Sequence, residues 1–244
     1  MGRIQKIKCS GQQLIVYLPE QVFQHQNKAA AVYCLAGQEM ETKLSEIVVP
    51  LEPCFGKELL PFILVLVPPR CWDDDFTPWV APPVSGREKP FGGKADAFLD
   101  WLCGYVKPLV ESVFSVNPSA DQTGLVGYSL GGLAALYAAY RSLPFGRIGS
   151  VSGSLWYPGW VEYMSSHRFP NQDIKVYLSL GAKEERTKDP FMSQGGSAVR
   201  KAKDLLDVRL KPGCCKLEWN SGGHFSDTSG RIRKALAWMM ENTK

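Results

Sequence analysis

The residues best suited to nucleophilic chemistry lie in the segment Gly127-Tyr-Ser-Leu-Gly-Gly132, which contains the pattern G-x-S-x-G. In that pattern the serine occupies a sharp turn between a strand and a helix, where its hydroxyl is free to attack a carbonyl carbon. An apolar strand-like run precedes the segment and a helix-forming run follows it. Side chains at positions 127 and 131 would clash in so tight a turn, and the helix N-terminus favours developing negative charge. We therefore expect Ser129 to be a nucleophile, with a glycine-rich packing turn as the alternative.

A general base for this serine is expected at His224, one of three histidines in the chain. It follows the last strand-like run and precedes the last helical one, which fits the chain order serine, acid, histidine. A neutral imidazole, with a reference pKa of ~6.5, can accept the serine proton at neutral pH. The acid must then follow the strand-like run 174–180, where Glu184 and Glu185 are the candidates and Asp189 is a more distant one. Spacing does not separate the adjacent glutamates; Glu184 is preferred and Glu185 is the alternative.

An oxyanion formed by such an attack needs N–H donors directed at it. The first expected donor is the backbone N–H of Leu130, directly after the serine. The second should come from a loop that follows an earlier strand, and Gln38 after Gly37 has that position. A simple helix start at Gln38 is the competing interpretation.

The elements that must position these residues alternate between strand-like and helical patterns. The expected strands cover residues 4–8, 13–18, 29–35, 63–67, 124–126, 148–151, 174–180 and 216–219, and the expected helices cover 39–47, 95–114, 130–140, 192–210 and 232–240. Residues 68–92 read as a long loop, and Pro108 should bend its helix. This order predicts one α/β-hydrolase domain over 1–244, with a mostly parallel central sheet, antiparallel N-terminal edge strands and helices on both faces. The candidate residues all follow strands, where ligands bind in such sheets.

Composition and charge exclude several other classes of protein. Hydrophobic residues make up 45% and charged residues 21% of the 244, and 28 basic against 24 acidic side chains give a net charge of +4. No run of five like charges indicates a nucleic-acid or membrane partner, and no apolar run approaches the ~20 residues of a membrane span. Seven cysteines without a CxxC pair favour reduced thiols over a disulfide or zinc site. With no apolar region after the basic N-terminus, a cytoplasmic protein without metal or cofactor is expected, and the oligomeric state stays open.

Several segments resemble one group of hydrolases. They are Phe76-Thr-Pro-Trp, Pro90-Phe-Gly-Gly-Lys-Ala-Asp-Ala-Phe-Leu, Gly127-Tyr-Ser-Leu-Gly-Gly-Leu-Ala-Ala-Leu-Tyr, Ser152-Gly-Ser-Leu-Trp-Tyr and Gly222-Gly-His. They are similar to the esterase D-type α/β-hydrolases, and most of all to the ferric-siderophore (enterobactin and salmochelin) esterases. The resemblance covers most of residues 12–240 and keeps the motif order.

The resemblance implies a serine hydrolase that acts on ester or lactone bonds of a small molecule and needs no metal. A siderophore substrate would be a bulky ferric tris-catecholate, for which Arg70 and the tryptophans Trp72, Trp79 and Trp156 would offer cationic and ring-face contacts. Alternatively, the tryptophans pack the long loop. The run Arg70-Cys-Trp-Asp-Asp-Asp departs from the longer, arginine-richer loops common in that branch.

Other activities stay open beside ester hydrolysis. Within enzymes, the chain could be a thioesterase similar to S-formylglutathione hydrolase, or an acyltransferase similar to the mycolyltransferases. From a different class, it could be a catalytically silent ligand-binding domain. A serine, a histidine and a candidate acid in the expected order argue against the silent domain, because loss of activity usually removes one of them.

Overall fold

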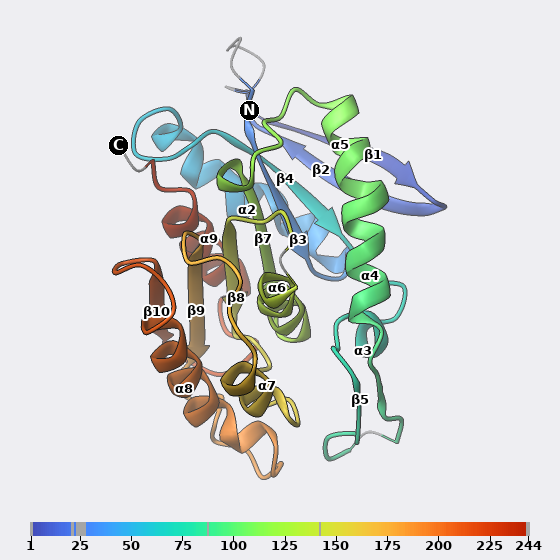
Figure 1. Cartoon of the computed structure of the whole chain (residues 1–244). Coiled ribbons are helices and arrows are strands. Elements are labelled where there is room, and N and C mark those ends of the chain that lie inside the picture. The colour runs from blue at the N-terminus through green and yellow to red at the C-terminus, as the bar shows by residue number, and fades with distance from the viewer. Residues whose placement is uncertain (1, 21, 23–27, 87, 142, 243–244) are drawn as a thin grey trace.

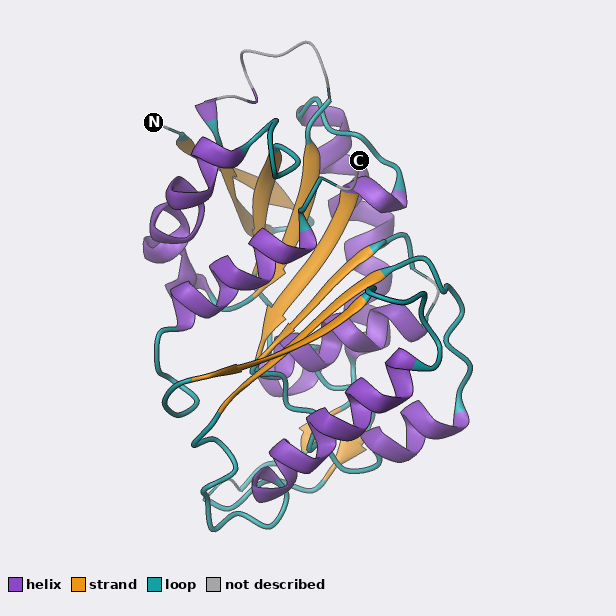
Figure 2. Cartoon of the chain, turned by 90° about the vertical axis from the view of Figure 1, so that its left-hand side faces the viewer, coloured by secondary structure: helices purple, strands orange, loops and turns teal. Residues whose placement is uncertain are grey.

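A single twisted sheet runs through the molecule (Figures 1 and 2). The computed structural model describes residues 2–20, 22, 28–86, 88–141 and 143–242. Eight strands build the sheet: β1 (Arg3–Cys9), β2 (Gln12–Leu18), β3 (Ala30–Leu35), β4 (Phe62–Val67), β7 (Thr123–Tyr128), β8 (Arg147–Val151), β9 (Lys175–Gly181) and β10 (Cys215–Asn220). Their order across the sheet is β1-β2-β4-β3-β7-β8-β9-β10.

The strand directions confirm the predicted sheet. The hairpin β1–β2 and the pair β2–β4 are antiparallel, and every pair from β4 to β10 is parallel. Because parallel strands need crossover connections, helices pack on the faces of the sheet. The carboxyl ends of β7, β9 and β10 therefore lie at one edge, where the candidate residues follow.

Helices cover both faces, as expected (Figure 2). One face packs against α4 (Ala95–Trp101), α5 (Lys107–Val113), α6 (Leu130–Tyr140), α7 (Trp160–Ser166) and α8 (Gly195–Asp207), and the other against α2 (Leu44–Val48) and α9 (Thr228–Met239). Strand β4 shows why a central strand is apolar throughout: Ile63, Val65 and Val67 enter the first core, while the residues between them enter the second. Burial on both sides replaces the alternating pattern of a surface strand.

The helix predicted over 95–114 has a wider turn in its middle. Between α4 and α5 lies a π-helical turn, η3 (Leu102–Val106), in which the N–H of Lys107 donates to the carbonyl of Leu102. Pro108 follows at once and has no N–H to donate, so the normal hydrogen-bond register cannot continue through it. The expected bend at Pro108 is thus a local change of helical register.

The segment 68–92, expected to be a structureless loop, contains regular elements, so that expectation was wrong. It holds α3 (Trp72–Asp75) and a small hairpin of β5 (Val80–Ala81) and β6 (Phe91–Gly92). The hydroxyl of Thr77 donates to the carbonyl of Asp73 at 2.7 Å and accepts the N–H of Gly93 at 3.0 Å. These local bonds satisfy backbone groups that a long loop would leave unpaired.

Four short 3-10 helices complete the described elements: η1 (Gln38–Lys43), η2 (Val49–Cys54), η4 (Ala120–Gln122) and η5 (Met192–Gln194). The helix predicted over 39–47 is therefore divided between η1 and α2. Among the described residues, no helix combines the length and the apolar character needed to cross a bilayer.

Candidate active site

Ser129 lies on a strained turn between β7 and α6. Its backbone has φ 59° and ψ −121°, a conformation that costs a residue with a side chain ~1–3 kcal/mol. Its N–H donates to the carbonyl of Val151 on the neighbouring strand at 3.1 Å, which helps to hold the turn. A Cβ on Gly127 would lie 2.1 Å from the carbonyl oxygen of Gly131, so the turn requires glycine there. This is the strand–turn–helix that the sequence predicted.

His224 lies beside Glu184 after the last strand. The imidazole Nδ1 is 2.6 Å from the Glu184 Oε2, and these side chains are 20% and 7% exposed, respectively. The other oxygen, Oε1, accepts the N–H of Gly181 at 2.6 Å and a guanidinium N–H of Arg231 at 2.7 Å. Both carboxylate oxygens are thus engaged, and the nitrogen of His224 that faces away from Glu184, Nε2, is left for another partner.

Two opposing effects set the charge state of Glu184. Burial raises the pKa of its carboxyl, but the hydrogen bond and charge of His224, the N–H of Gly181 and the hydroxyl of Ser152 outweigh burial. The net result is a pKa below the ordinary glutamate value. The carboxyl is therefore ionised at neutral pH, which is the form that pairs with an imidazolium.

The other two acid candidates lie elsewhere. Glu185 directs its carboxylate to Arg200, 3.6 Å away at the surface. Asp189 is buried and accepts the N–H groups of Ser85, Phe191 and Met192 at 2.5, 2.9 and 2.9 Å. It therefore ties the 68–92 segment to the loop before α8, whereas the carboxylate that contacts His224 is that of Glu184.

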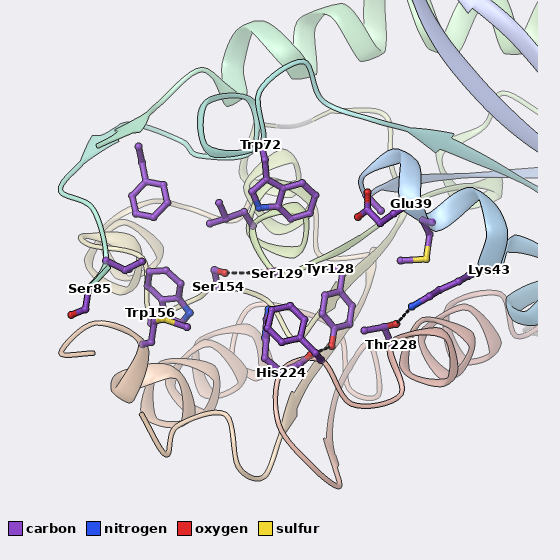
Figure 3. Close-up of a pocket in the computed structure, with 17 residues that line it drawn as sticks. Glu39, Lys43, Trp72, Ser85, Tyr128, Ser129, Ser154, Trp156, His224 and Thr228 are labelled. Atoms are coloured by element: carbon purple, nitrogen blue, oxygen red, sulfur yellow. Dashed lines mark hydrogen bonds between the residues drawn. The ribbon is translucent and has the colours of Figure 1, made fainter. Parts of the chain in front are cut away.

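A cavity of about 580 Å³ opens over the serine (Figure 3). Ser129, Leu130 and His224 line it together. In this conformation the Ser129 Oγ is 3.3 Å from the Ser154 Oγ, and among the described residues it makes no hydrogen bond to His224. As Leu130 is the first residue of α6, its N–H has no partner within the helix. Gln38 is exposed at the start of η1 and does not line the cavity, although its neighbours Ala36, Glu39 and Met40 do.

Aromatic side chains form much of the cavity wall. Trp72, Phe91, Trp156 and Phe225 line it, and Phe225 is 88% exposed at its rim. Trp79 belongs elsewhere: its indole N–H donates to the carbonyl of Pro158 at 2.8 Å, and its ring packs in an aromatic cluster with four neighbours. The tryptophans thus divide between the cavity and the packing of the long segment.

Arg70 is not brought to the serine. It lines a second hollow of about 310 Å³ together with Gln12, Lys94 and Trp101. The carboxylate of Asp75 accepts the backbone N–H of Arg70 at 2.7 Å and so fixes the chain at that position. The short α3 that follows places Trp72, rather than Arg70, on the cavity side.

Charge in the cavity wall is balanced. One acidic side chain, Glu39, and one basic side chain, Lys43, line the cavity, and both belong to η1. The Lys43 ammonium donates to the Thr228 hydroxyl at 3.0 Å (Figure 3). No group of three or more His, Cys, Asp or Glu residues in the described part of the chain is placed to hold a metal ion. The wall is otherwise mainly apolar, which suits an organic ligand of moderate size.

Sequence reasoning missed several residues of this site. Ser154 beside the serine and Met192 in the wall carried no motif of their own, although Ser154 lies in the quoted segment Ser152-Gly-Ser-Leu-Trp-Tyr. Arg231 lies just before the helix predicted over 232–240 and was not singled out, yet it contacts Glu184. The burial of Arg231 could have been inferred from the sequence, because position 231 shares a helix face with the apolar Ala235 four residues later.

Comparison with known proteins places the chain in a family. A sequence model described as "Putative esterase" matches residues 7–224, a range that contains both Ser129 and His224. The uncharacterized protein YbbA of Bacillus subtilis is 28% identical over 98% of this chain and 96% of its own length. The iron(III) enterobactin esterase of Escherichia coli K12 is 27% identical over 48% of this chain, a match that spans only 29% of that esterase.

A solved structure extends the likeness to the fold. The IroE-like serine hydrolase of Shewanella oneidensis superposes with a TM-score of 0.73 at 19% identity, over 98% of this chain and 78% of that one. At this identity the superposition bears on the fold, whereas the sequence model bears on the family. The chain therefore belongs to this esterase family, is related to the siderophore esterases and has the α/β-hydrolase fold.

Proposed function

We propose that the protein is a serine esterase that hydrolyses carboxylic ester or lactone bonds through an acyl-enzyme. The observation that carries the proposal is the 2.6 Å contact between His224 Nδ1 and Glu184 Oε2, beside a cavity that Ser129 also lines. With Nδ1 engaged by the carboxylate, Nε2 is the nitrogen that accepts the serine proton. Glu184 holds the ring orientation and stabilises the imidazolium.

In the first half of the reaction, Ser129 Oγ bonds to the carbonyl carbon as His224 takes its proton. The tetrahedral oxyanion is stabilised by the N–H of Leu130. As the second donor we propose the N–H of Gln38, whose side chain is exposed but whose backbone lies in the loop after β3 between the cavity residues Ala36 and Glu39. Collapse breaks the bond to the alcohol oxygen, which leaves with the proton from His224. Water, deprotonated by the same imidazole, then attacks the acyl carbon and releases the acid and Ser129.

For the substrate we propose an ester of a siderophore, with the ferric catecholate as the first candidate. The support is the relation to siderophore esterases together with the aromatic wall, where Trp156 would contact a catechol ring. Arg70, which lines the second hollow, has no place in this substrate contact.

A cytoplasmic setting is proposed from the cysteines: all seven, each among the described residues, are free thiols.

The nucleophile is tested by labelling with a fluorophosphonate probe. The wild-type protein should be labelled and Ser129→Ala should not. The matched control is Ser154→Ala, which removes the neighbouring hydroxyl and should still be labelled. A wild-type protein that resists the probe would overturn the serine mechanism.

The substrate is tested by kcat/KM for ferric and iron-free enterobactin beside short aryl esters and an acyl-glutathione thioester. Preference for a trilactone supports a siderophore esterase. Preference for the thioester identifies a thioesterase instead, and indifference to the trilactones leaves a general esterase. Ligand-induced thermal stabilisation without any product would mark a silent binding domain.

A further inference from the structure

A buried arginine lies directly behind the proposed triad. Arg231, in the first turn of α9, is 1% exposed. Its Nη1 donates to Glu184 Oε1 at 2.7 Å and to the Ser152 hydroxyl at 2.8 Å, with the Tyr128 hydroxyl at 3.4 Å. A guanidinium is costly to remove from water unless a counter-ion and acceptors satisfy it, and here the counter-ion is the proposed triad acid.

The other arm of the same guanidinium holds the loop that carries the histidine. Nη2 donates to the carbonyls of Ser221 and Gly223, each at 2.8 Å. These residues lie three positions and one position before His224 in the chain. One planar group therefore fixes both members of the Glu184–His224 pair, through a carboxylate oxygen on one side and through backbone on the other.

Two neighbouring residues, Gly181 and Ser152, are constrained by the planar, forked guanidinium of Arg231. A Cβ on Gly181 would lie 2.7 Å from Arg231 Nη2 and 2.8 Å from Glu184 Oε1, so a larger residue would displace the ion pair. Ser152, which accepts from Nη1, has a φ of 45°, a conformation that L-residues rarely adopt. Backbone strain of this kind persists only where neighbouring contacts fix it, and the bond to Arg231 is one such contact.

We infer that Arg231 is a positioning residue of the esterase: it orients the Glu184 carboxylate and the His224 loop and offsets part of the charge of Glu184. The inference rests on the triad proposed above. Arg231 does not line the cavity, so it acts through these two residues and not on the substrate.

The charge of Arg231 has an effect that a purely structural anchor would lack. The charged or titratable groups near the pair are Arg231 from α9 and Tyr128 from β7, with Glu39 and Lys43 of η1 in the cavity wall. The positive charge of Arg231 lies 2.7 Å from the Glu184 carboxylate and favours its ionised form. Without it, Glu184 binds a proton at higher pH, and the neutral carboxyl no longer stabilises the imidazolium of the proposed mechanism. The acid limb of the pH profile of kcat/KM should therefore move upward.

Two variants separate charge from geometry. Arg231→Met removes both and should lower kcat ~10- to 100-fold through misplacement of the pair, while the acid limb rises by about 1 pH unit. Arg231→Lys keeps the charge but loses the planar fork, so kcat should fall while the acid limb stays near the wild-type position. KM should change little in either variant, because the cavity wall is intact.

The matched control is Arg147, a second buried arginine at the opposite end of the sheet. Its guanidinium donates to the carbonyls of Asp121, Met239 and Glu241, and none of these three residues lines the cavity. Arg147→Met should reduce stability without moving the acid limb. If Arg231→Met lowers activity with the limb unmoved, as a structural anchor would, the inference is overturned.

A milder variant tests the inference if Arg231→Met does not fold. Ser152→Ala removes one acceptor of the fork and should lower kcat roughly 5-fold. Unchanged kcat in both Ser152→Ala and Arg231→Lys would overturn the inference. Fluorophosphonate labelling distinguishes a failure of the proposed function from a failure of the inference about Arg231. An unlabelled wild type refutes the proposed function. A labelled wild type together with unchanged kcat in the Arg231 variants refutes only the role of Arg231.

Discussion

The hydroxyl oxygens of Ser129 and Ser154 lie 3.3 Å apart, and the N–H of Ser154 donates to the carbonyl of Ser129 at 3.0 Å. Ser154 is 1% exposed and follows β8, so the neighbouring strand end holds the proposed nucleophile at both its side chain and its backbone. In this resting arrangement the Ser129 hydroxyl is partnered by a hydroxyl. In the proposed mechanism it exchanges that partner for His224 when proton transfer begins.

Removal of this partner should weaken catalysis modestly. Ser154→Ala is expected to lower kcat/KM roughly 5-fold, the equivalent of one hydrogen bond that positions the nucleophile. Ser150→Ala is the control, because the buried Ser150 hydroxyl has no hydrogen-bond partner among the described residues. Equal kcat/KM for Ser154→Ala and wild type would show that the contact does not assist the reaction.

The adjacent glutamates should differ sharply in activity. Glu184→Gln is expected to lower kcat about 10³- to 10⁴-fold, since an amide cannot balance the charge of the imidazolium. Glu185→Gln loses only a surface ion pair with Arg200 and should stay within about two-fold of wild type. Steady-state kinetics on one aryl ester measures this difference, and a comparable loss of kcat in the two variants would contradict Glu184 as the acid.

Glu184 should also make stability depend on pH. Its folded-state pKa is below the ordinary value of 4.5, so its ionised form stabilises the fold above that pH, and this contribution is lost as pH falls through the folded-state pKa. Glu184→Gln leaves Arg231 buried without its counter-ion and should cost about 3 kcal/mol at neutral pH. Urea denaturation should show this difference narrowing below pH 4.5, and a constant difference down to pH 3 would refute it.

Asp189 should affect substrate binding more than turnover. It joins the N–H groups of Ser85 and Met192, two cavity residues from different segments, through one buried carboxylate. Asp189→Asn can keep only part of these bonds, so the wall loosens and KM should rise several-fold while kcat changes less. Asp204→Asn, on the exposed side of α8, serves as the control. A fall in kcat with KM unchanged would argue against a role in shaping the wall.

The sheet and the strand–turn–helix at Ser129 were predictable because they depend on local pattern. Apolar runs of strand length specify β3, β4 and β9, and the glycines around Ser129 specify a turn that admits little else. The order of Ser129, Glu184 and His224 follows from the order of the strands that precede them. Each of these inferences needs only neighbours in sequence and the rule that parallel strands end at one edge.

Other features depend on contacts between distant segments. Glu184 rather than Glu185 contacts His224 in a loop that is held against the chain after β10, where the N–H of Lys183 donates to the carbonyl of Gly222 at 3.0 Å. The placement of Arg70 outside the cavity depends on how α3 packs. Arg231 and Arg233 look alike in sequence, but Arg231 is buried behind the Glu184–His224 pair and Arg233 donates to the carbonyl of Glu46.

The 68–92 segment carries one further consequence. Trp72, Val84, Ser85 and Phe91, which line the cavity, come from this one segment between β4 and α4. The proposed acid, base and arginine instead come from the β9, β10 and α9 half of the molecule. Substitutions within 68–92 can therefore reshape this part of the cavity wall without replacing any residue that holds Glu184 or His224.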